Sequence, residues 1–324
     1  MKITTIAKKY GTQVKCLNYL EKLRWGKTVK CPYCGSEKNK RYKTQKNRHK
    51  CYSCNRSFSV LVDTIFEDTR LPLSDWFIVI GLMLNSKSGI ASKEIQRNIG
   101  VTYKTAFYTS MRIRCGMLIE YSMLNGIVEA DESYFGGKTR SKMPSAKYIS
   151  KSEANLSAKG MASKRCRGTN KISVAGMVER KGNVKTKVIE KLTKRNLLAF
   201  LKNTVNTNDS LLMTDGFRSY KEFDKYVERM VINHKKQFSR GIVHVNTIEG
   251  FWSYVKNGIR GSYKAISPKY LPLYLIEYEW KYNNRNYKGD MFEKYLKNAL
   301  SHEKDTEYWK ISTPKKVKKI VYGK

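Results

Sequence analysis

The chain has 324 residues and carries 64 Lys and Arg against 27 Asp and Glu, a formal net charge of +37. A charge excess of this size attracts polyanions, because bound phosphates release their counterions, so double-stranded DNA is the expected partner. The longest nearly continuous apolar run, residues 76–84, is too short to span a bilayer, and the N-terminus does not resemble a secretory signal. We therefore expect no membrane segment, a cytoplasmic, nucleoid-associated location, and about two domains with smaller appendages.

Four of the seven cysteines form two close pairs, which is the strongest single motif in the chain. Cys31 and Cys34 make the first pair, Cys51 and Cys54 make the second, and sixteen residues separate them, as is typical of a structural Zn²⁺ site. The basic segment between the pairs predicts short strands in a ribbon too small to fold without its metal. A redox dithiol pair and an iron–sulfur site fit the pattern less well, and His49 could replace one cysteine.

Two helical regions are predicted around this ribbon. A helix through Leu17, Leu20 and Leu23 is expected to end near residues 24–26 and to pack against the ribbon. Residues 70–118 also read as helical, with an N-cap offered at 73–76.

The second half of that helical region predicts a helix-turn-helix. Ser92 can cap a first helix, Gly100 supplies the turn, and Thr102 caps a second helix. We predict that Lys104 and Arg112 on the second helix bind DNA. An ordinary helical hairpin is the alternative.

From Gly126 the pattern changes to short segments rich in Val, Ile, Met and Thr, which predict strands at 127–133, 171–180, 184–190 and 211–214. A hairpin is predicted at residues 182–183, and the apolar spacing over 194–205 predicts a helix before the fourth strand. The region 247–298 reads as helical and aromatic; its rings are expected mainly in the core, with base stacking as the minority interpretation. These elements indicate an α/β fold.

A loop at 138–171 separates the first two of these strands and contains ten Lys or Arg and one acid. Because it follows the first strand closely, we interpret it as a phosphate-binding arm rather than a solvated linker. The residues expected to bind DNA there are Lys138, Arg140, Lys164, Arg165 and Arg167. The basic tail at 314–319 is expected to add nonspecific DNA affinity at most.

Three carboxylates stand where strands or a helix could aim them at one point. Asp131 is predicted to end the first strand and bridge two metal ions, Asp215 to end the fourth strand, and Glu249 to lie on a helix. Two divalent cations about 4 Å apart are a common device for phosphodiester chemistry. Oxygen ligands suit Mg²⁺ or Mn²⁺, and strand motifs without histidine argue against catalytic zinc, although His244 lies nearby.

Together these residues resemble the bacterial insertion-sequence transposases of the DDE type, specifically the ISXO-like group with an N-terminal zinc ribbon. The resemblance rests on the two cysteine pairs and on residues 129–138, 214–216 and 244–253, and it covers nearly the whole chain. It implies an RNase H-like catalytic core, in which a mixed sheet flanked by helices brings two aspartates and a third acidic residue together. It also selects Asp131 over Glu129 and Glu132, a choice that strand alternation alone cannot make.

The resemblance leaves two candidates for the third metal ligand, because the broader group uses either Asn or Glu there. We favour Glu249 over Asn246, since an ionised carboxylate binds Mg²⁺ more strongly than an amide does. The family has a basic residue after this position, and Lys256 stands two helical turns beyond Glu249, on the same helix face. Lys256 is expected to bind a DNA phosphate and Arg260 to extend the contact; a solvated helix face is the alternative.

The sequence thus predicts an insertion-sequence transposase that binds the ends of its element and then cuts and joins DNA. A homodimer or larger assembly is expected, because two ends must be brought together. The alternatives are a noncatalytic DNA-binding regulator derived from a transposase and an RNase H-like nuclease that cuts without joining. The predicted domains are 1–68 with the zinc ribbon, 69–122 with the helix-turn-helix-like region, 123–300 with the catalytic core, and the basic tail 301–324.

Overall fold

The fold is taken from a computed structural model that describes residues 1–45, 47–119, 121–136, 171–232 and 243–301. The five basic residues expected to bind DNA between 138 and 167 and the tail at 314–319 lie outside these ranges. Within them, no helix combines the length and the apolar character needed to cross a bilayer.

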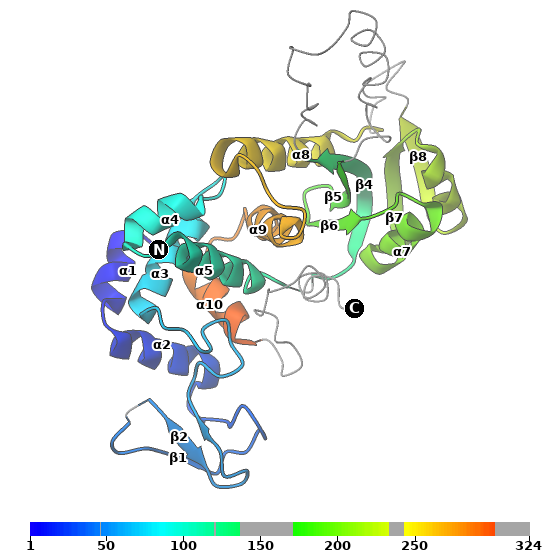
Figure 1. The fold of residues 1–324 in the computed structure, drawn as a ribbon. Coiled ribbons are helices and arrows are strands. Elements are labelled where there is room, and N and C mark those ends of the chain that lie inside the picture. The colour runs from blue at the N-terminus through cyan, green and yellow to red at the C-terminus, as the bar shows by residue number, and fades with distance from the viewer. Residues whose placement is uncertain (46, 120, 137–170, 233–242, 302–324) are drawn as a thin grey trace, which may run out of the picture.

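Helices from both ends of the chain enclose one apolar core (Figure 1). Leu20, Trp76 and Ile113 from the N-terminal helices pack in it with Trp280 and Leu296 from the C-terminal ones. The helices concerned are α1 (Ile3–Tyr10), α2 (Gln13–Trp25), α3 (Leu73–Asn85), α4 (Ser92–Ile99), α5 (Tyr103–Cys115), α9 (Leu271–Asn283) and α10 (Met291–Ser301). The helix predicted through Leu17, Leu20 and Leu23 is α2, which packs in this core and contacts the ribbon only near its end.

The predicted helix-turn-helix corresponds to α4 and α5. Gly100 ends α4 in the left-handed conformation at φ +66°, and the Thr102 hydroxyl accepts a hydrogen bond from Thr105 N, so both of those predictions are confirmed. The predicted cap at Ser92 is wrong, because Ala91 is the N-cap and the Ser92 hydroxyl lies 3.4 Å from that of Ser110 on α5. Similarly, α3 starts after Pro72 without a side-chain cap.

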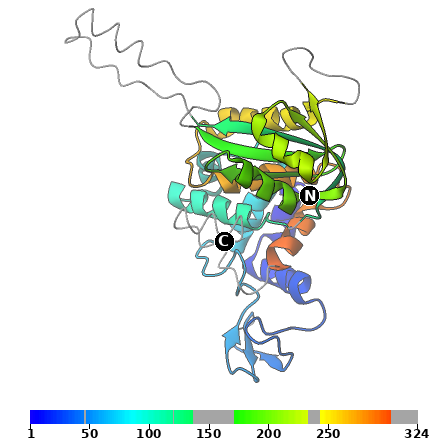
Figure 2. The same ribbon diagram turned by 90° about the vertical axis from the view of Figure 1, so that its right-hand side faces the viewer.

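The ribbon is a three-stranded antiparallel sheet of β1 (Asn39–Arg41), β2 (His49–Cys51) and β3 (Ser57–Phe58). It lies at the end of the molecule farthest from the larger sheet (Figures 1 and 2). Its buried apolar cluster consists of Cys31, Cys51 and Phe58, with Trp25 of α2 packed against it. A core this small supports the prediction that the ribbon depends on its metal.

The larger sheet contains β4 (Leu124–Phe135), β5 (Ile172–Glu179), β6 (Val184–Ile189), β7 (Val205–Asp215) and β8 (Glu228–Ile232). The strand order is β6-β5-β4-β7-β8, with β4, β5 and β6 antiparallel in succession and β7 and β8 parallel to β4. This is the mixed, RNase H-like sheet that the resemblance implied. The hairpin predicted at residues 182–183 joins β5 to β6.

Helices cover both faces of this sheet. On one face, α7 (Lys194–Thr204) and the 3₁₀ segment η2 (Arg218–Lys225) pack on Val128 and Ala130. On the other, α8 (Asn246–Gly258), its π-helical continuation η3 (Ile259–Tyr263) and α9 pack on Phe135 and Met213. Since side chains alternate along a strand, Glu129 and Asp131 share the α8 face with Phe135.

The strands differ from the prediction in three places: the end of β4, the start of β7 and the additional strand β8. β4 continues to Phe135, whose ring meets Trp252 at 5.9 Å between centroids, so Asp131 lies within the strand rather than at its end. β7 starts at Val205, which pairs with Leu124 of β4, although the polar residues 206–209 that follow resemble a loop and fall where the register shifts. β8 was missed because it is an edge strand with exposed, polar positions.

Candidate active site and zinc ribbon

The sheet register places two of the predicted metal ligands side by side. Ala130 of β4 pairs with Thr214 of β7, so Asp131 and Asp215 follow on adjacent parallel strands. Met213, two residues before Asp215, packs on the α8 face, and alternation puts Asp215 on that face too. Asp215 is the last residue of β7, as predicted, and one carboxylate oxygen accepts a hydrogen bond from Phe217 N at 2.9 Å.

Helix α8 supplies the third carboxylate. It approaches the sheet closely, because a side chain at Gly176, opposite Asp131 in the register, would meet the Trp252 ring at 2.5 Å. Glu249, in the first turn of α8, is exposed and lines a pocket of about 310 Å³ together with Asp131 and Lys256. The three predicted carboxylates therefore come from β4, β7 and α8 to one side of the sheet.

The charges of these groups interact strongly. The pKa of Asp131 is raised to about 7, chiefly by burial and then by the negative charges of Glu132, Asp215 and Glu249, while backbone hydrogen bonding opposes the shift. Burial is also the main reason that the pKa of Lys256 is lowered; Asp131 opposes that effect, whereas Arg260 and Lys171 add to it. The pocket thus holds carboxylates and cations together.

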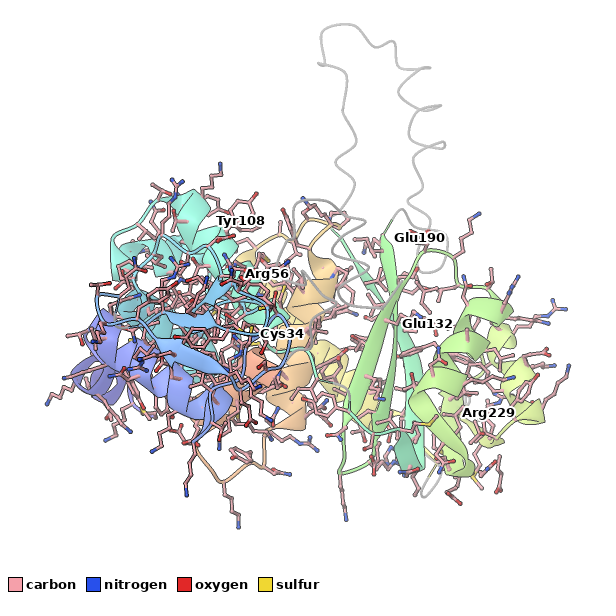
Figure 3. The ribbon with its side chains drawn as sticks, turned by 90° about the horizontal axis from the view of Figure 1, so that it is seen from below. Cys34, Arg56, Tyr108, Glu132, Glu190 and Arg229 are labelled. Carbon is pink, nitrogen blue, oxygen red and sulfur yellow. The ribbon has the colours of Figure 1, made fainter. Side chains whose placement is uncertain are left out.

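The two acids beside Asp131 have different partners. Glu129 is fully buried and accepts hydrogen bonds from the backbone N–H groups of Thr247 and Ile248, at 2.8 and 3.0 Å, and from Arg180 Nε at 2.6 Å. It therefore fastens the first turn of α8, and hence Glu249, to the centre of the sheet. Glu132 accepts a 2.6 Å hydrogen bond from the Tyr220 hydroxyl and lies among the strands near α7 (Figure 3).

The role of Glu129 could not be derived from the sequence alone, because its hydrogen-bond partners are 51 to 119 residues away. His244 belongs to the same cluster: its Nδ1 lies 3.0 Å from an Arg180 nitrogen and 3.3 Å from Glu129. Asn246 is exposed at the start of α8 and lines a different cavity from Glu249. The structure thus separates the two candidates for the third metal ligand.

The predicted DNA-binding residues fall in two places. Lys256 and Arg260 line the acidic pocket, on α8 and on η3 respectively. Lys104 and Arg112 line a shallow cleft between α5 and residues 68–71. Arg112 is half-buried there, donates to the Glu67 carbonyl at 2.6 Å and lies over the Trp76 ring, whereas Lys104 is exposed.

The four cysteines of the ribbon converge as predicted. Their sulfurs all lie within 4.8 Å of one another, with 3.7 Å between Cys31 and Cys54 and 3.6 Å between Cys34 and Cys51. Four thiolates at about 2.3 Å around a tetrahedral Zn²⁺ would be about 3.8 Å apart, so the donor set fits this metal. Backbone N–H groups, chiefly that of Cys54, lower the pKa of the Cys51 thiol to about 6 and favour the thiolate that binds zinc.

His49 does not join this group. It is buried, stacks on Phe58 with 5.3 Å between ring centroids, and lies 3.5 Å from Glu21 of α2. Among the described residues, the four cysteines are the only set of three or more potential ligands close enough to hold one ion. The carboxylates of the acidic pocket are spread more widely.

Comparison with known proteins agrees with this architecture. Residues 123–283 match the family model of the ISXO2-like transposase domain, and residues 11–57 match the transposase zinc-ribbon domain. An uncharacterized protein in transposable element ISH50 of Halobacterium salinarum is 26% identical over 84% of this chain and 91% of its own length. An uncharacterized transposase-like protein of Haemophilus influenzae is 31% identical over 34% of this chain and 89% of its own length.

Among solved structures, a pre-cleavage Mos1 transpososome is 10% identical, with 75% of this chain and 77% of that chain covered and a TM-score of 0.25; a likeness of that size bears on neither fold nor function. The zinc ribbon, the helices and the RNase H-like sheet, together with these family matches, define the class of the protein as an insertion-sequence transposase. More narrowly, the chain belongs to the ISXO2-like transposase family.

Proposed function

We propose that this transposase cuts and joins DNA with divalent metal ions bound by Asp131, Asp215 and Glu249. One observation carries the proposal: three elements spread over 118 residues of the chain, from Asp131 to Glu249, bring these carboxylates to the same side of the sheet. Lys256 and Arg260 line the same pocket as Asp131 and Glu249, so cations that can bind the phosphates of DNA lie beside the carboxylates.

The donor set fits Mg²⁺ or Mn²⁺. Its ligands are oxygens, and their crowded charges raise the pKa of Asp131, a repulsion that a bound cation would relieve. Phosphodiester chemistry commonly uses two such ions about 4 Å apart. When bound, such ions activate an attacking oxygen and stabilise the leaving one.

The protein's own residues then hold the DNA and the site in place. Lys256 and Arg260 bind phosphates of the strand that enters the pocket, and Glu129 holds α8 so that Glu249 faces Asp131. Water is the first nucleophile and frees a 3′-hydroxyl, which then attacks a target phosphodiester in line. Both steps exchange one phosphoester bond for another P–O bond, so no covalent bond between enzyme and DNA is required.

DNA recognition is assigned to the regions before the catalytic core and to the basic loop. The zinc ribbon and the α4–α5 pair bind the element ends, with exposed Lys104 a better candidate for phosphate contact than half-buried Arg112. The loop at 138–171 contributes further phosphate contacts. Since an element has two ends, the active form is a homodimer or a larger assembly on DNA, with the domain boundaries predicted above.

The test is a cleavage and joining assay with duplex DNA from one end of the element, with and without Mg²⁺. The proposal expects metal-dependent strand cleavage and a joined product from the wild type. Asp131→Asn and Asp215→Asn should lose both products and keep DNA binding. DNA binding with no metal-dependent cleavage in the wild type would favour the noncatalytic regulator, and cleavage without joining would favour the nuclease.

A further inference from the structure

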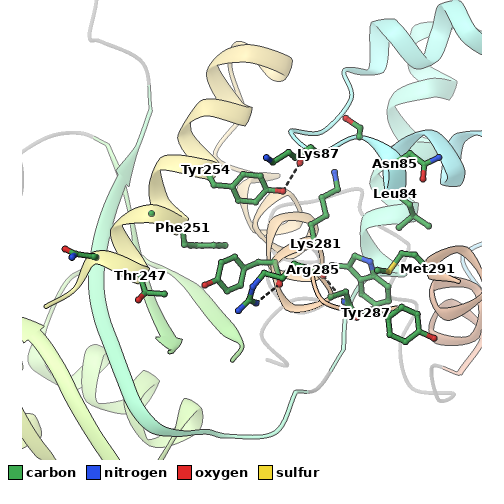
Figure 4. Close-up of a pocket in the computed structure, with 16 residues that line it drawn as sticks. Leu84, Asn85, Lys87, Thr247, Phe251, Tyr254, Lys281, Arg285, Tyr287 and Met291 are labelled. Atoms are coloured by element: carbon green, nitrogen blue, oxygen red, sulfur yellow. Dashed lines mark hydrogen bonds between the residues drawn. The ribbon is translucent and has the colours of Figure 1, made fainter. Parts of the chain in front are cut away.

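Helix α8 has a second functional face. Glu249 and Lys256 line the acidic pocket, whereas Thr247, Phe251 and Tyr254 line a separate cavity of about 730 Å³ (Figure 4). The end of α3 and the loop after it, the C-terminal half of α9 and the start of α10 close the remaining sides. The two sites are therefore about one helix diameter apart, ~10 Å.

The cavity is lined by aromatic rings. Phe251 and Tyr254 of α8 and Tyr282 of α9 line it, and Tyr287, beyond the end of α9, is exposed (Figure 4). Phe251 and Tyr282 meet edge to face, with 5.3 Å between their centroids. These rings can bind a flat, polarisable group, because aromatic rings attract one another in offset or edge-to-face contacts.

The same cavity carries positive charge and no acid. Its lining includes Lys87, Lys281 and Arg285, and none of the lining residues is Asp or Glu. Lys281 is paired with Glu277 at 2.6 Å, but Lys87 and Arg285 are exposed. The Arg285 guanidinium lies 4.1 Å from the centroid of the Tyr282 ring, so charge and ring surface are presented together.

A ring surface beside cations matches one kind of ligand. An apolar peptide side chain would gain nothing from the cations, and a lone phosphate would gain nothing from the rings, whereas a nucleotide uses both. The cavity is concave and lies between helices, so a base pair within a duplex cannot enter it. An unpaired base can, at the cost of leaving its stack.

We propose that this cavity binds one unpaired nucleotide of the DNA substrate, with the base among the rings of Tyr254, Tyr282 and Tyr287 and a phosphate at Lys87 and Arg285. The inference rests on the proposed function, because it places this nucleotide within a helix diameter of the phosphodiester held in the acidic pocket. The cavity thus determines how the end of the strand is positioned at the acidic pocket. Asn246 also lines the cavity, and its amide can form hydrogen bonds to the edge of a base.

Gly250 offers a clean way to block the cavity. It lies on α8, lines the cavity, and a side chain added there would meet nothing within 4 Å. A leucine at this position would therefore occupy the cavity and leave the helix intact, because leucine favours helices more than glycine does. Tyr287→Ala removes an exposed ring from the rim without touching the core.

The experiment uses the full-length protein and a fluorescent duplex with one unpaired 2-aminopurine, compared with the same duplex fully paired, in Ca²⁺ buffer. The wild type should bind the unpaired form about tenfold more tightly and quench the 2-aminopurine on binding. Gly250→Leu and Tyr287→Ala should each lose most of this preference while affinity for the paired duplex is unchanged. Tyr226→Ala is the matched control, because Tyr226 is also exposed and has Lys202 3.8 Å from its ring centroid, but it lies outside the cavity.

Equal affinity of the wild type for the two duplexes would overturn the inference, and so would a preference that survives Gly250→Leu. A change of oligomeric state in Gly250→Leu with the preference retained would show instead that the cavity takes a side chain of a second copy. Failure of the proposed function is a separate result, since it would appear as a lack of metal-dependent cleavage in a protein that still distinguishes the two duplexes. Absence of all DNA binding would refute both.

Discussion

The repulsion within the acidic pocket leads to a specific prediction about the stability of Asp131→Asn. The pKa of Asp131 is raised from its ordinary value of 3.8 to about 7, first by burial and then by neighbouring carboxylates. In the unfolded chain this carboxyl group loses its proton near pH 4, whereas in the folded chain it keeps the proton up to about pH 7. Its contribution to the free energy of unfolding is therefore complete below about pH 4 and is lost as the pH rises from about 4 to 7.

The size of the effect follows from the same pKa difference. Each tenfold change in proton affinity corresponds to about 1.36 kcal/mol. Relative to low pH, the free energy of unfolding of the metal-free wild type is therefore lower by about 4 kcal/mol at about pH 7.5 and by about 1 kcal/mol at about pH 4.5. Asparagine does not ionise, so Asp131→Asn should be more stable than the wild type by about these amounts. The variant removes a ligand and yet raises the free energy of unfolding.

Urea denaturation of the metal-free proteins at both pH values measures this difference. Asp209→Asn is the matched control, because Asp209 is an exposed carboxylate in the same strand, six residues before Asp215, and its effect should be small at both pH values. Adding Mg²⁺ at about pH 7.5 should stabilise the wild type more than Asp131→Asn. If Asp131→Asn were less stable than the wild type at about pH 7.5, or differed from it equally at both pH values, the electrostatic account of the pocket would be wrong.

Three further predictions concern the zinc ribbon and two ion pairs with buried carboxylates. Cys51→Ser should lower bound zinc, measured by mass spectrometry of the metal, whereas Cys115→Ala should retain it, because Cys115 lies in α5 outside the ribbon. Glu129→Ala should lower the free energy of unfolding by about 3–5 kcal/mol, because it removes a fully buried carboxylate that accepts from half-buried Arg180 and from two helix N–H groups; a loss below about 1 kcal/mol would contradict this. Arg114→Met should also lower the free energy of unfolding in urea denaturation, since it removes one of the two cations paired with fully buried Glu277 and leaves Lys281 as the other, and Arg114→Met with Glu277→Gln should recover part of that loss.

The sequence was most informative where the controlling interactions are local. Paired cysteines are constrained by metal geometry, and Gly100 and Thr102 act within one helical turn, so the ribbon and the start of α5 could be predicted. The strands of the catalytic core were recognisable from their β-branched content, and the family motif selected Asp131 among three neighbouring acids. β8 could not be recognised in this way, because it is an edge strand with polar, exposed positions.

Other features depend on contacts between distant segments and left no local signal. Glu129 accepts a hydrogen bond from the first turn of α8, 118 residues away along the chain. Arg114 of α5 and Glu277 of α9, 163 residues apart, form a fully buried ion pair. The second contact shows why the C-terminal helices share a core with the N-terminal ones, which composition could not reveal. The aromatic residues of α8 and α9 were expected mainly in the core, and the cavity they line was likewise visible only in three dimensions.

The third carboxylate provides the most direct test of the central claim, since the sequence offered both Glu249 and Asn246 for its role. The measurement is Mg²⁺-dependent joining of element-end DNA by Glu249→Gln and Asn246→Ala, with DNA binding measured in parallel. If Asp131, Asp215 and Glu249 hold the metal, Glu249→Gln will bind DNA but form no joined product, and Asn246→Ala will still form it. Joining by Glu249→Gln at the wild-type rate, together with its loss in Asn246→Ala, would contradict the account.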